Sequence, residues 1–339
     1  MLKINTRILS KRTTGVQRYL KKIINNHSGF DTVCDNRYFQ GHIWEQALLP
    51  NLLSKSDVLW SPSNTGPLYC KAAHVVTIHD FATLDHPEWT SRKFSTFYRF
   101  LLPKLVKRCD AIIAISEYTK SRIMYHSNVC EDKIHVIRNG VDEEFFDKPS
   151  IDDSLVLSKY YIPTKRYVLS VSSIEPRKNL KSLLLAWNKI VNVIDDDIYL
   201  ILVGVSNPKI FADLNLTNLP PRVHFTGFVD DNDLSVIYHN ALLFCYVSFY
   251  EGFGLPPLEA MAAGVPVITS NATSIPEVVG DKAVTLSPDA IDDIAENIIN
   301  ILGDESLRTR MGLAGISHAK NFSWNDTATR TFELLKSFE

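Results

Sequence analysis

Short apolar segments alternate with longer amphipathic segments along most of the chain. The apolar segments are rich in Val, Ile, Leu and aromatic residues, and each ends near Gly, Asn, Asp or Ser. They span residues 74–80, 109–116, 133–140, 166–173, 197–204, 222–228, 241–248 and 265–270. Strands that are apolar on both faces are typical of parallel sheets covered by helices on both sides. The pattern therefore predicts an α/β protein built on parallel sheets.

A polar segment with two prolines separates two groups of these strands. It reads DKPSIDDSLVLSKYYIPTK (147–165), and a strongly apolar segment follows it. Prolines and polar residues are typical of boundaries between domains. We therefore expect an N-terminal domain over residues 1–148, a linker over 149–164 and a C-terminal domain over 165–322.

The last residues of the chain, 323–339, predict a separate helix. Ser323 suits the N-cap position, because its side chain can accept hydrogen bonds from amides of the first helical turn. Four apolar residues would form the buried face of this helix: Phe332, Leu334, Leu335 and Phe338.

The length of the chain supports two domains, each with a core of its own. It has 339 residues, of which 45% are hydrophobic and 22% charged, as is ordinary for a globular protein. The net charge of −2 gives no sign of nucleic-acid binding. Residues 1–148 carry 21 Lys and Arg against 15 Asp and Glu (+6), whereas the remainder carries 15 against 23 (−8). We expect the two halves to face different partners.

The cysteines, the lengths of the apolar segments and the N-terminal residues together indicate the cellular compartment of the protein. Five cysteines are scattered without C-x-x-C spacing, which argues against a zinc site or a disulfide framework and for a reducing compartment. No apolar segment reaches the length of a membrane span. The N-terminal residues MLKINTRILSKRTTG lack the apolar core of a signal peptide. We therefore expect a cytoplasmic protein.

The segment EGFGLPPLE (251–259) carries the most chemical information. Two glycines followed by two prolines cannot continue a helix from Glu251, but proline suits the first turn of a helix that begins there. We expect Glu251 on a loop and Glu259 one turn into a new helix. Amides at a helix start can bind an anion and carboxylates can bind hydroxyls, so the segment suits a nucleotide sugar. Taken alone, it fits two solvated glutamates at a strand–turn–helix junction equally well.

The residues that follow, GVPVITSNATSIPEVVGD (264–281), predict a buried strand and a second junction marked by glycine and proline. The E-x7-E pair, the G-x-P-V strand (264–267) and the S-x-P-E-V turn (274–278) together resemble the retaining glycosyltransferases of family 4. The resemblance extends from about residue 7 to residue 324. It implies the GT-B fold, with two Rossmann-like parallel-sheet domains facing a cleft that holds the ligands. It also implies that the final helix crosses back to the N-terminal domain.

Two basic residues occur in SVSSIEPRKNL (170–180), after the first strand of the C-terminal domain. Arg177 and Lys178 lie where a diphosphate would reach, and both residue types bind phosphate oxygens. Basic residues in such a loop are often only solvated. The string E-P-R-K-N is typical of one branch of the family, and the resemblance implies a phosphate role for both. Other branches place an arginine near the position of Ser172, which leaves open how the two residues divide the work.

The segment TIHDFATLDHPEW (77–89) places a histidine and an aspartate at the end of a buried strand. In the family, an H-D pair here faces the donor sugar and its loop lines the acceptor site. The resemblance therefore implies a catalytic and acceptor-binding role for His79 and an acceptor-binding role for Asp80. The alternative is that His79 is a structural hydrogen-bonding residue.

Near the N-terminus, RTTGVQRYL (12–20) places a glycine between a first strand and a helix. Family members carry a similar string, and the resemblance implies that Gly15 and Val16 contact the donor through their backbone. The string is not the G-x-G-x-x-G dinucleotide fingerprint, which counts against an NAD enzyme.

In HFTGFVDDNDL (224–234), the family uses the backbone to read the nucleobase edge, which makes Gly227, Phe228 and Val229 candidates. The acidic runs 195–197 and 230–233 could suggest a D-x-D metal site. The family generally needs no metal, and the first run precedes an apolar strand like an ordinary loop. We therefore expect no metal and no cofactor.

A basic amphipathic segment, SRKFSTFYRFLLPKLVKR, occupies residues 91–108. It holds six Lys and Arg and no acidic residue, and aromatic and leucine residues are interleaved with them. Such a helix can lie on anionic lipid, on the inner face of the plasma membrane. The alternative is a domain helix whose apolar face is core and whose basic face is solvated.

The resemblance implies transfer of a hexose from a nucleoside diphosphate to an acceptor hydroxyl with retention of the anomeric configuration. Lys178, Arg177 and the amides at the helix start would stabilise the departing diphosphate. Glu259 would bind the ribose hydroxyls. Glu251 would bind the sugar hydroxyls, together with the amides of the residues that follow it: Gly252, Phe253, Gly254 and Leu255.

Four strings, TGVQRY, GHIWEQ (41–46), SPSNTGP (61–67) and EPRKN, resemble bacterial mannosyl- and rhamnosyltransferases that build surface polysaccharides. GDP-mannose is therefore the favoured donor and dTDP-rhamnose the second. The expected acceptor is a saccharide, which such enzymes often receive linked to polyprenyl diphosphate. The alternatives are a GT-B epimerase or phosphorylase, and a non-catalytic subunit that binds a nucleotide sugar or lipid.

Overall fold

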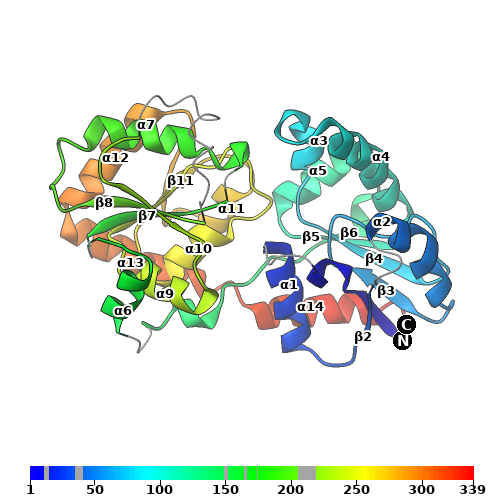
Figure 1. Cartoon of the computed structure of the whole chain (residues 1–339). Helices are drawn as coiled ribbons and strands as arrows, with labels where there is room; N and C mark the ends of the chain where they lie inside the picture. Colours follow the sequence, from blue (N-terminus) through cyan, green and yellow to red (C-terminus); the bar gives the residue numbers. More distant parts are fainter. Residues whose placement is uncertain (11–14, 35–40, 149–151, 164–165, 174, 205–218) are drawn as a thin grey trace. The chain divides into compact units, whose positions relative to one another are not determined.

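The computed structural model describes residues 1–10, 15–34, 41–148, 152–163, 166–173, 175–204 and 219–339. These residues form two compact units (Figure 1). The first unit contains Met1–Gly140 together with Phe322–Glu339, and the second contains Val141–Asn321. Each unit is built on an open parallel sheet flanked by helices.

The strands of each unit are all parallel to their neighbours. The first sheet has the order β2-β1-β3-β4-β5-β6 and consists of β1 (Leu2–Asn5), β2 (Asp31–Val33), β3 (Val58–Ser61), β4 (Ala73–Ile78), β5 (Ala111–Ala114) and β6 (Ile134–Val136). The second has the order β12-β11-β10-β7-β8-β9 and consists of β7 (Tyr167–Val171), β8 (Tyr199–Val203), β9 (Val223–Gly227), β10 (Leu243–Tyr246), β11 (Val267–Ser270) and β12 (Val284–Leu286). Each apolar segment of the sequence overlaps one of these strands, so the predicted α/β class with parallel sheets is confirmed.

The helices of the described residues connect these strands. They are α1 (Gly15–Asn26), α2 (Gly41–Ile43), α3 (Ala82–Asp85), α4 (Arg92–Arg108), α5 (Glu117–Ser127), α6 (Asp153–Lys159), α7 (Leu180–Ile190), α9 (Asp231–His239), α10 (Leu255–Ala262), α11 (Ile275–Val279), α12 (Ile291–Gly303), α13 (Glu305–Ala319) and α14 (Trp324–Lys336). A π-helical turn spans Trp44–Leu48, and short 3-10 turns span Arg7–Ser10, Leu49–Leu52, Pro87–Trp89, Glu131–Lys133, Glu143–Phe145 and Pro176–Lys178.

The final helix of the chain belongs to the first unit, where α14 packs against α1 (Figure 1). Ser323 caps it, since its side chain accepts from the amides of Asn325 and Asp326. A Cβ atom at Gly140 would lie 2.1 Å from the amide nitrogen of Trp324, so only glycine allows the two backbones to approach this closely. The predicted N-cap and the predicted return of the last helix to the N-terminal domain are confirmed.

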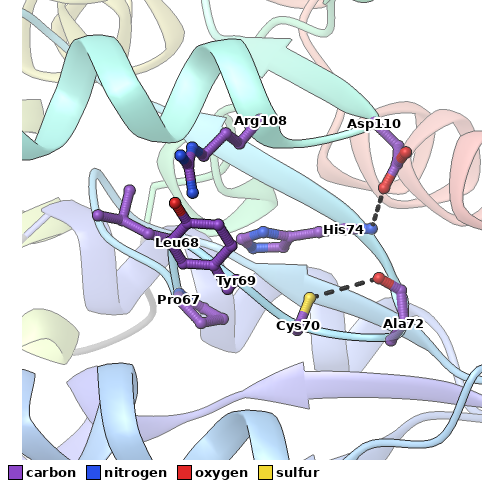
Figure 2. Close-up of a pocket in the computed structure, with 8 residues that line it drawn as sticks. All are labelled: Pro67, Leu68, Tyr69, Cys70, Ala72, His74, Arg108 and Asp110. Atoms are coloured by element: carbon purple, nitrogen blue, oxygen red, sulfur yellow. Dashed lines mark hydrogen bonds between the residues drawn. The ribbon is translucent and has the colours of Figure 1, made fainter.

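The connection from β3 to β4 shapes one edge of the first unit. Residues 67–72 of this connection, the start of β4, the end of α4 and the residue before β5 line a cavity of about 220 Å³ that is open to solvent on one side (Figure 2). Parallel strands start at the same edge of a sheet, so the cavity lies at the amino ends of β4 and β5.

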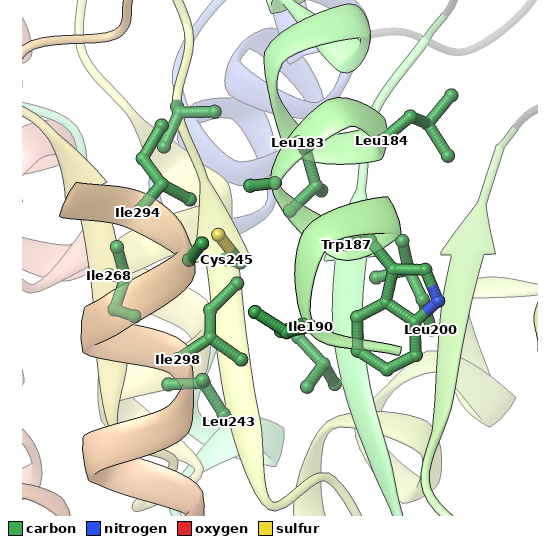
Figure 3. Close-up of a cluster of buried hydrophobic side chains, with 14 of the residues drawn as sticks. Leu183, Leu184, Trp187, Ile190, Leu200, Leu243, Cys245, Ile268, Ile294 and Ile298 are labelled. Carbon is green, nitrogen blue, oxygen red and sulfur yellow. The ribbon is translucent and has the colours of Figure 1, made fainter. Parts of the chain in front are cut away.

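The core of the second unit lies between its sheet and the helices α7 and α12 (Figure 3). Leu183 and Ile190 of α7 face Ile294 and Ile298 of α12, whereas Trp187 lies on the other side of α7, beside Leu200 (Figure 3). Strand residues from β7, β8, β10 and β11 complete the cluster: Val168, Leu200, Leu202, Leu243, Cys245 and Ile268. This packing fixes the strands whose carboxyl ends carry the candidate site.

The segment assigned to a linker, residues 149–164, contains helix α6. Its residues Val156 and Leu157 are buried, and the helix packs against α9 of the second unit. The compact units divide between Gly140 and Val141. Two prolines and several polar residues made this segment resemble a linker, but its short apolar run allows it to pack on the second unit.

Candidate active site

Three candidate residues of the second unit, Arg177, Lys178 and Glu251, meet at the carboxyl ends of β7 and β10. These strands are neighbours, and the strand order reverses between them, because β8 and β9 lie beyond β7 whereas β11 and β12 lie beyond β10. Open α/β sheets bind ligands at such a reversal. The loop after β7 carries Arg177 and Lys178 in a 3-10 turn, and the loop after β10 carries Glu251.

The carboxylate of Glu251 is the centre of the site. Its Oε1 accepts hydrogen bonds from Lys178 Nζ, the Tyr246 hydroxyl and the Ser248 hydroxyl, each at 2.7 Å. Lys178 Nζ also donates to the Tyr246 hydroxyl at 2.7 Å. The Glu251 carboxylate therefore ties the loop after β7 to the end of β10.

Arg177 lies between two carboxylates. Its Nη1 donates to Glu251 Oε2 at 3.2 Å, and its Nε donates to Glu175 Oε2 at 2.5 Å. The backbone carbonyl of Arg177 accepts from the amide of Phe249 at 2.7 Å. Side-chain and backbone contacts thus hold both basic residues at one position.

Burial and charge together set the ionisation of this cluster. Burial opposes ionisation of Glu251, which is 6% exposed, yet Lys178 and Arg177 outweigh burial and hold its pKa at about 2. Burial lowers the pKa of Lys178, whereas the carboxylate of Glu251 favours its ammonium form. Burial also raises the pKa of Tyr246 well above its usual value. At neutral pH, Glu251 is a carboxylate and Tyr246 a protonated donor.

The backbone around Glu251 is fixed by residues from the next junction. The amide of Glu251 donates to Thr273 Oγ1 at 3.0 Å, and the Ser274 hydroxyl lies 2.9 Å from the Glu251 carbonyl oxygen. Gly254 has φ of 116°, and a Cβ atom there would lie 2.6 Å from Ile275 Cδ1. A left-handed backbone in so little space requires glycine.

Glu259 lies in α10, as predicted, and Glu251 lies on a loop, as predicted. Both glutamates are buried, Glu259 with 4% exposure, so they are not the solvated pair of the alternative interpretation. The hydroxyl of Tyr238, on α9, donates to Glu259 Oε2 at 3.0 Å. Pro256 and Pro257 have no N–H, so the amide donors at this helix start are limited to residues 252–255.

The candidates after β9 have different environments. Gly227 has φ of 71°, and its carbonyl oxygen accepts from the amide of Gly204 at 2.7 Å. Phe228 is 55% exposed, whereas Val229 is buried. They lie at the same carboxyl edge as Lys178, but β8 separates β9 from β7. Their contact with a nucleobase stays a prediction.

In the first unit, His79 and Asp80 follow β4. His79 is buried, its Nε2 donates to the Pro62 carbonyl oxygen at 2.9 Å, and its amide donates to Asn64 Oδ1 at 2.7 Å. Burial lowers the pKa of His79, which favours the neutral ring. These bonds support the structural alternative for His79, and its contact with ligands stays a prediction.

Asp80 and Gly15 are less buried than His79. Asp80 Oδ1 accepts from the amide of Ala82 at 3.2 Å and so fixes the start of α3. Gly15 is exposed at the start of α1, with no atom within 4 Å of a Cβ atom built there, and Val16 is half-buried. Residues 12–14 of the predicted string lie outside the described residues. The predicted contacts of Asp80, Gly15 and Val16 with ligands are not tested by this geometry.

Sequence reasoning missed two groups of polar residues at the carboxyl ends of the strands. In the second unit these are Tyr246 and Ser248, whose only signal is their position five and three residues before Glu251. In the first unit, Glu45 is fully buried in the π-helical turn. Its Oε1 accepts from Arg7 Nη2 at 3.2 Å, and also from Asn5 Nδ2 and Thr65 Oγ1. Glu45 belongs to the GHIWEQ string, which contributes to the resemblance to bacterial mannosyl- and rhamnosyltransferases but indicates no role for Glu45.

Within the ranges described above, no group of three or more His, Cys, Asp or Glu side chains could hold a metal ion. In the same residues, no helix combines the length and the apolar character needed to cross a membrane.

Comparison with known proteins identifies relatives of both units. A family model described as Glycosyl transferases group 1 matches residues 158–318, and one described as Glycosyltransferase Family 4 matches residues 12–145. O-antigen chain mannosyltransferase B of Escherichia coli is 33% identical over 268 residues, which cover 77% of this chain and 70% of that protein. The serotype-specific mannosyltransferase WbdA of the same species is 31% identical over 248 residues, which cover 70% of this chain. This chain thus spans about a third of WbdA, since the match covers 30% of it.

Among solved structures, HepE of Anabaena in complex with UDP and glucose is similar to the whole chain. The TM-score is 0.76, the sequence identity is 19%, and the match covers 99% of each chain. At this identity, the likeness shows a shared fold.

Replacing Glu251 by Gln tests the buried ion pairs. The variant leaves buried cations without their carboxylate, so we expect a loss of about 3 kcal/mol in the free energy of unfolding at pH 7. Because the folded pKa of Glu251 lies at about 2, below its usual value, its contribution is present near neutral pH and disappears as the pH falls from about 5 to 2. Urea unfolding at pH 7 and at pH 3 measures both effects.

The matched control is Asp292→Asn, which removes the exposed ion pair between Asp292 and Lys189. This control should change stability little at either pH. Equal effects of the two substitutions at pH 7 would contradict the central position given to Glu251.

Proposed function

This chain belongs to the family 4 glycosyltransferases and has their GT-B fold, and we propose that it transfers a hexose from a nucleoside diphosphate to a saccharide acceptor with retention of anomeric configuration. Mannose from GDP-mannose is the favoured substrate, because the relatives at 31–33% identity are named as mannosyltransferases. The two that we compare act in O-antigen or serotype-specific synthesis by name, which favours a bacterial surface polysaccharide as the product. The observation that carries the proposal is the buried pairing of Lys178 and Arg177 with Glu251 at the strand-order reversal.

The chemical demand of the reaction is to stabilise the departing diphosphate. Lys178 and Arg177 are two cations, 10% and 22% exposed, held at the carboxyl ends of β7 and β10. Preorganised positive charge in a buried site stabilises developing negative charge without reorganisation at the moment of reaction. These two residues supply the charge that a divalent metal supplies in other transferases, so we propose a metal-independent reaction.

The donor would lie along the carboxyl edge of the second sheet. Glu259 would bind the ribose hydroxyls, with its carboxylate oriented by Tyr238. Glu251 and the amides of Gly252, Phe253, Gly254 and Leu255 would orient the sugar. Gly227, Phe228 and Val229 would contact the base, and Gly15 and Val16 would approach the donor from the first unit.

We assign the acceptor to the first unit. His79 and Asp80 follow β4 at the carboxyl edge of that sheet, where open sheets bind ligands. The neutral ring of His79 and the carboxylate of Asp80 could each hydrogen-bond a saccharide hydroxyl. Under this proposal, residues of the first unit select the acceptor and residues of the second bind the donor.

Helix α4 supports contact with an anionic membrane surface. It buries Leu101, Leu102, Leu105 and Val106 but leaves three aromatic residues at the surface: Phe94 (45% exposed), Phe97 (36%) and Phe100 (57%). Lys104 Nζ lies 3.4 Å from the centroid of the Phe100 ring. The alternative of an apolar face in the core therefore accounts for the leucines and the valine but not for the three phenylalanines. We propose that this stripe lies on the cytoplasmic face of the membrane, next to a lipid-linked acceptor.

The transferase assignment predicts that Lys178→Ala and Glu259→Ala each lose most activity. Removing one preorganised group that stabilises transition-state charge costs roughly 100- to 1000-fold in kcat, and we expect a loss of that order for Lys178→Ala. Glu259→Ala should act mainly by weakening donor binding. The measurement is release of GDP from GDP-mannose, or of dTDP from dTDP-rhamnose, in the presence and absence of a saccharide acceptor.

Lys189→Ala is the control, because Lys189 is exposed on α7 and pairs only with Asp292 among the described contacts. Nucleotide release that does not depend on an acceptor would exclude a transferase. Wild-type turnover in both variants would refute the donor site.

The membrane assignment predicts that the protein binds vesicles containing phosphatidylglycerol at low salt and not vesicles of phosphatidylcholine alone. Each lysine near an anionic surface contributes about 1 kcal/mol, so Lys104→Ser with Lys107→Ser should weaken binding roughly 25-fold. Phe100→Ser should weaken it further. Leu313→Ser, at a position 65% exposed on α13, is the control and should bind like the wild type. Binding that none of the α4 substitutions weakens would refute this surface.

A further inference from the structure

The cavity at the amino ends of β4 and β5 is not part of the site described above. It is lined by Pro67, Leu68, Tyr69, Cys70, Ala72, His74, Arg108 and Asp110 (Figure 2). His74 is the second residue of β4, whereas the candidate residue His79 follows the last one. At about 3.3 Å per strand residue, the two positions are roughly 17 Å apart along the strand.

The cavity contains one positive and one negative side chain. Burial raises the pKa of Cys70 to about 11 and lowers that of His74 to about 4, so both are neutral at pH 7. The remaining charges are those of Arg108 and Asp110. Because they are opposite, the cavity has no net charge.

Arg108 and Asp110 do not pair with each other in the described contacts, although both line the cavity. The guanidinium of Arg108 lies over the Tyr69 ring, 3.7 Å from its centroid, and Figure 2 shows Asp110 on the far side of His74 from it. Asp110 Oδ2 accepts from the amide of His74 at 2.7 Å. Tyr69 is 70% exposed, and Arg108 and Asp110 are also exposed. Among the residues that the structure describes, no hydrogen bond or ion pair engages the Arg108 guanidinium, the Tyr69 hydroxyl or Asp110 Oδ1, so solvent and any ligand can reach these groups.

These groups define what would fit. An anion would be attracted by Arg108 but repelled by Asp110, whereas a cation would be attracted by Asp110 but repelled by Arg108. A neutral ligand rich in hydroxyls can accept from the guanidinium and donate to the carboxylate at once. Pro67, Leu68 and Ala72 add an apolar wall for C–H groups. The volume of about 220 Å³ exceeds the roughly 150 Å³ of an engineered protein cavity that binds benzene, and it suits a single sugar ring.

We propose that this cavity is a second saccharide-binding site, which takes one neutral sugar unit of a chain whose reacting end lies elsewhere. The site binds through Arg108, Tyr69 and Asp110. This inference rests on the proposed function for one point, the presence of a saccharide chain. A growing polysaccharide would present sugar units that are remote from the reacting hydroxyl. Occupation of the cavity would keep a long acceptor bound between transfers.

The test is binding of tetrasaccharides of mannose and of rhamnose to the full chain without donor, measured by saturation-transfer NMR and calorimetry. We expect Arg108→Gln and Tyr69→Ala each to weaken binding at least ten-fold, and Asp110→Asn to weaken it less, since the amide oxygen of Asn can still accept. Lys71→Ala is the matched control, because Lys71 is exposed beside the cavity but does not line it. It should bind like the wild type.

Arg108 and Tyr69 are held mainly by their mutual contact, so Arg108→Gln and Tyr69→Ala should unfold at the same urea midpoint as the wild type. The variant Tyr69→Phe checks that the aromatic ring alone preserves the local fold. Absence of binding by either tetrasaccharide, or equal binding by Arg108→Gln and the wild type, overturns the proposal. Inorganic phosphate that displaces the tetrasaccharide and whose binding is lost in Arg108→Gln overturns it in favour of an anion site.

Activity separates this proposal from the proposed function. Transfer to a disaccharide acceptor should be the same in Arg108→Gln and the wild type, whereas KM for the tetrasaccharide acceptor should rise about ten-fold. If the wild type transfers sugar but no variant changes this KM, the second site fails and the transferase stands. If no donor is turned over, the transferase fails and the binding data still decide the second site.

Discussion

The ionised carboxylate of Glu251 is the constraint on which the candidate site depends. A buried carboxylate is costly unless cations and hydrogen-bond donors surround it. Here Lys178, Arg177, Tyr246 and Ser248 surround it, and they come from the loop after β7 and from the end of β10. The same contacts hold the two cations in place, so the position of the basic residues follows from the burial of one acid.

This arrangement gives Glu251 a role besides contact with a sugar. Both of its oxygens already accept from protein donors, and Oε1 accepts three times. A diphosphate that reaches Lys178 therefore meets a cation paired with Glu251, and it must compete with that pair or share the cation. Glu259 is buried in a different way, with a hydroxyl donor on α9. The two glutamates of the E-x7-E segment thus have distinct physical environments.

Much of the fold could be predicted from the sequence, because most of the long apolar segments form strands that are buried on both faces of a sheet, whereas the edge strands β6 and β9 are only half-buried. The strands β2, β3 and β12 were not predicted. β2 and β12 have three residues each, which carry no pattern, and β3 (Val58–Ser61) has only four. The EGFGLPPLE segment gave a loop and a helix start, because glycine and proline restrict the backbone directly. Tyr246 and Ser248 were missed, since only the pairing of β7 with β10 brings them to Lys178. The direction of the His79 ring likewise depends on Pro62, 17 residues away, which no local pattern reveals.

The central claim is that Lys178 and Arg177, positioned by Glu251, receive the diphosphate of the donor. The most direct measurement is a crystal structure of the protein with bound GDP. The account predicts phosphate oxygens within hydrogen-bond distance of Lys178 Nζ and of the Arg177 guanidinium, with Glu251 still in contact with Tyr246. A GDP molecule bound away from Lys178 would contradict it. A structure in which Lys178 keeps its contact with Glu251 and the phosphates are excluded from Lys178 would contradict it as well.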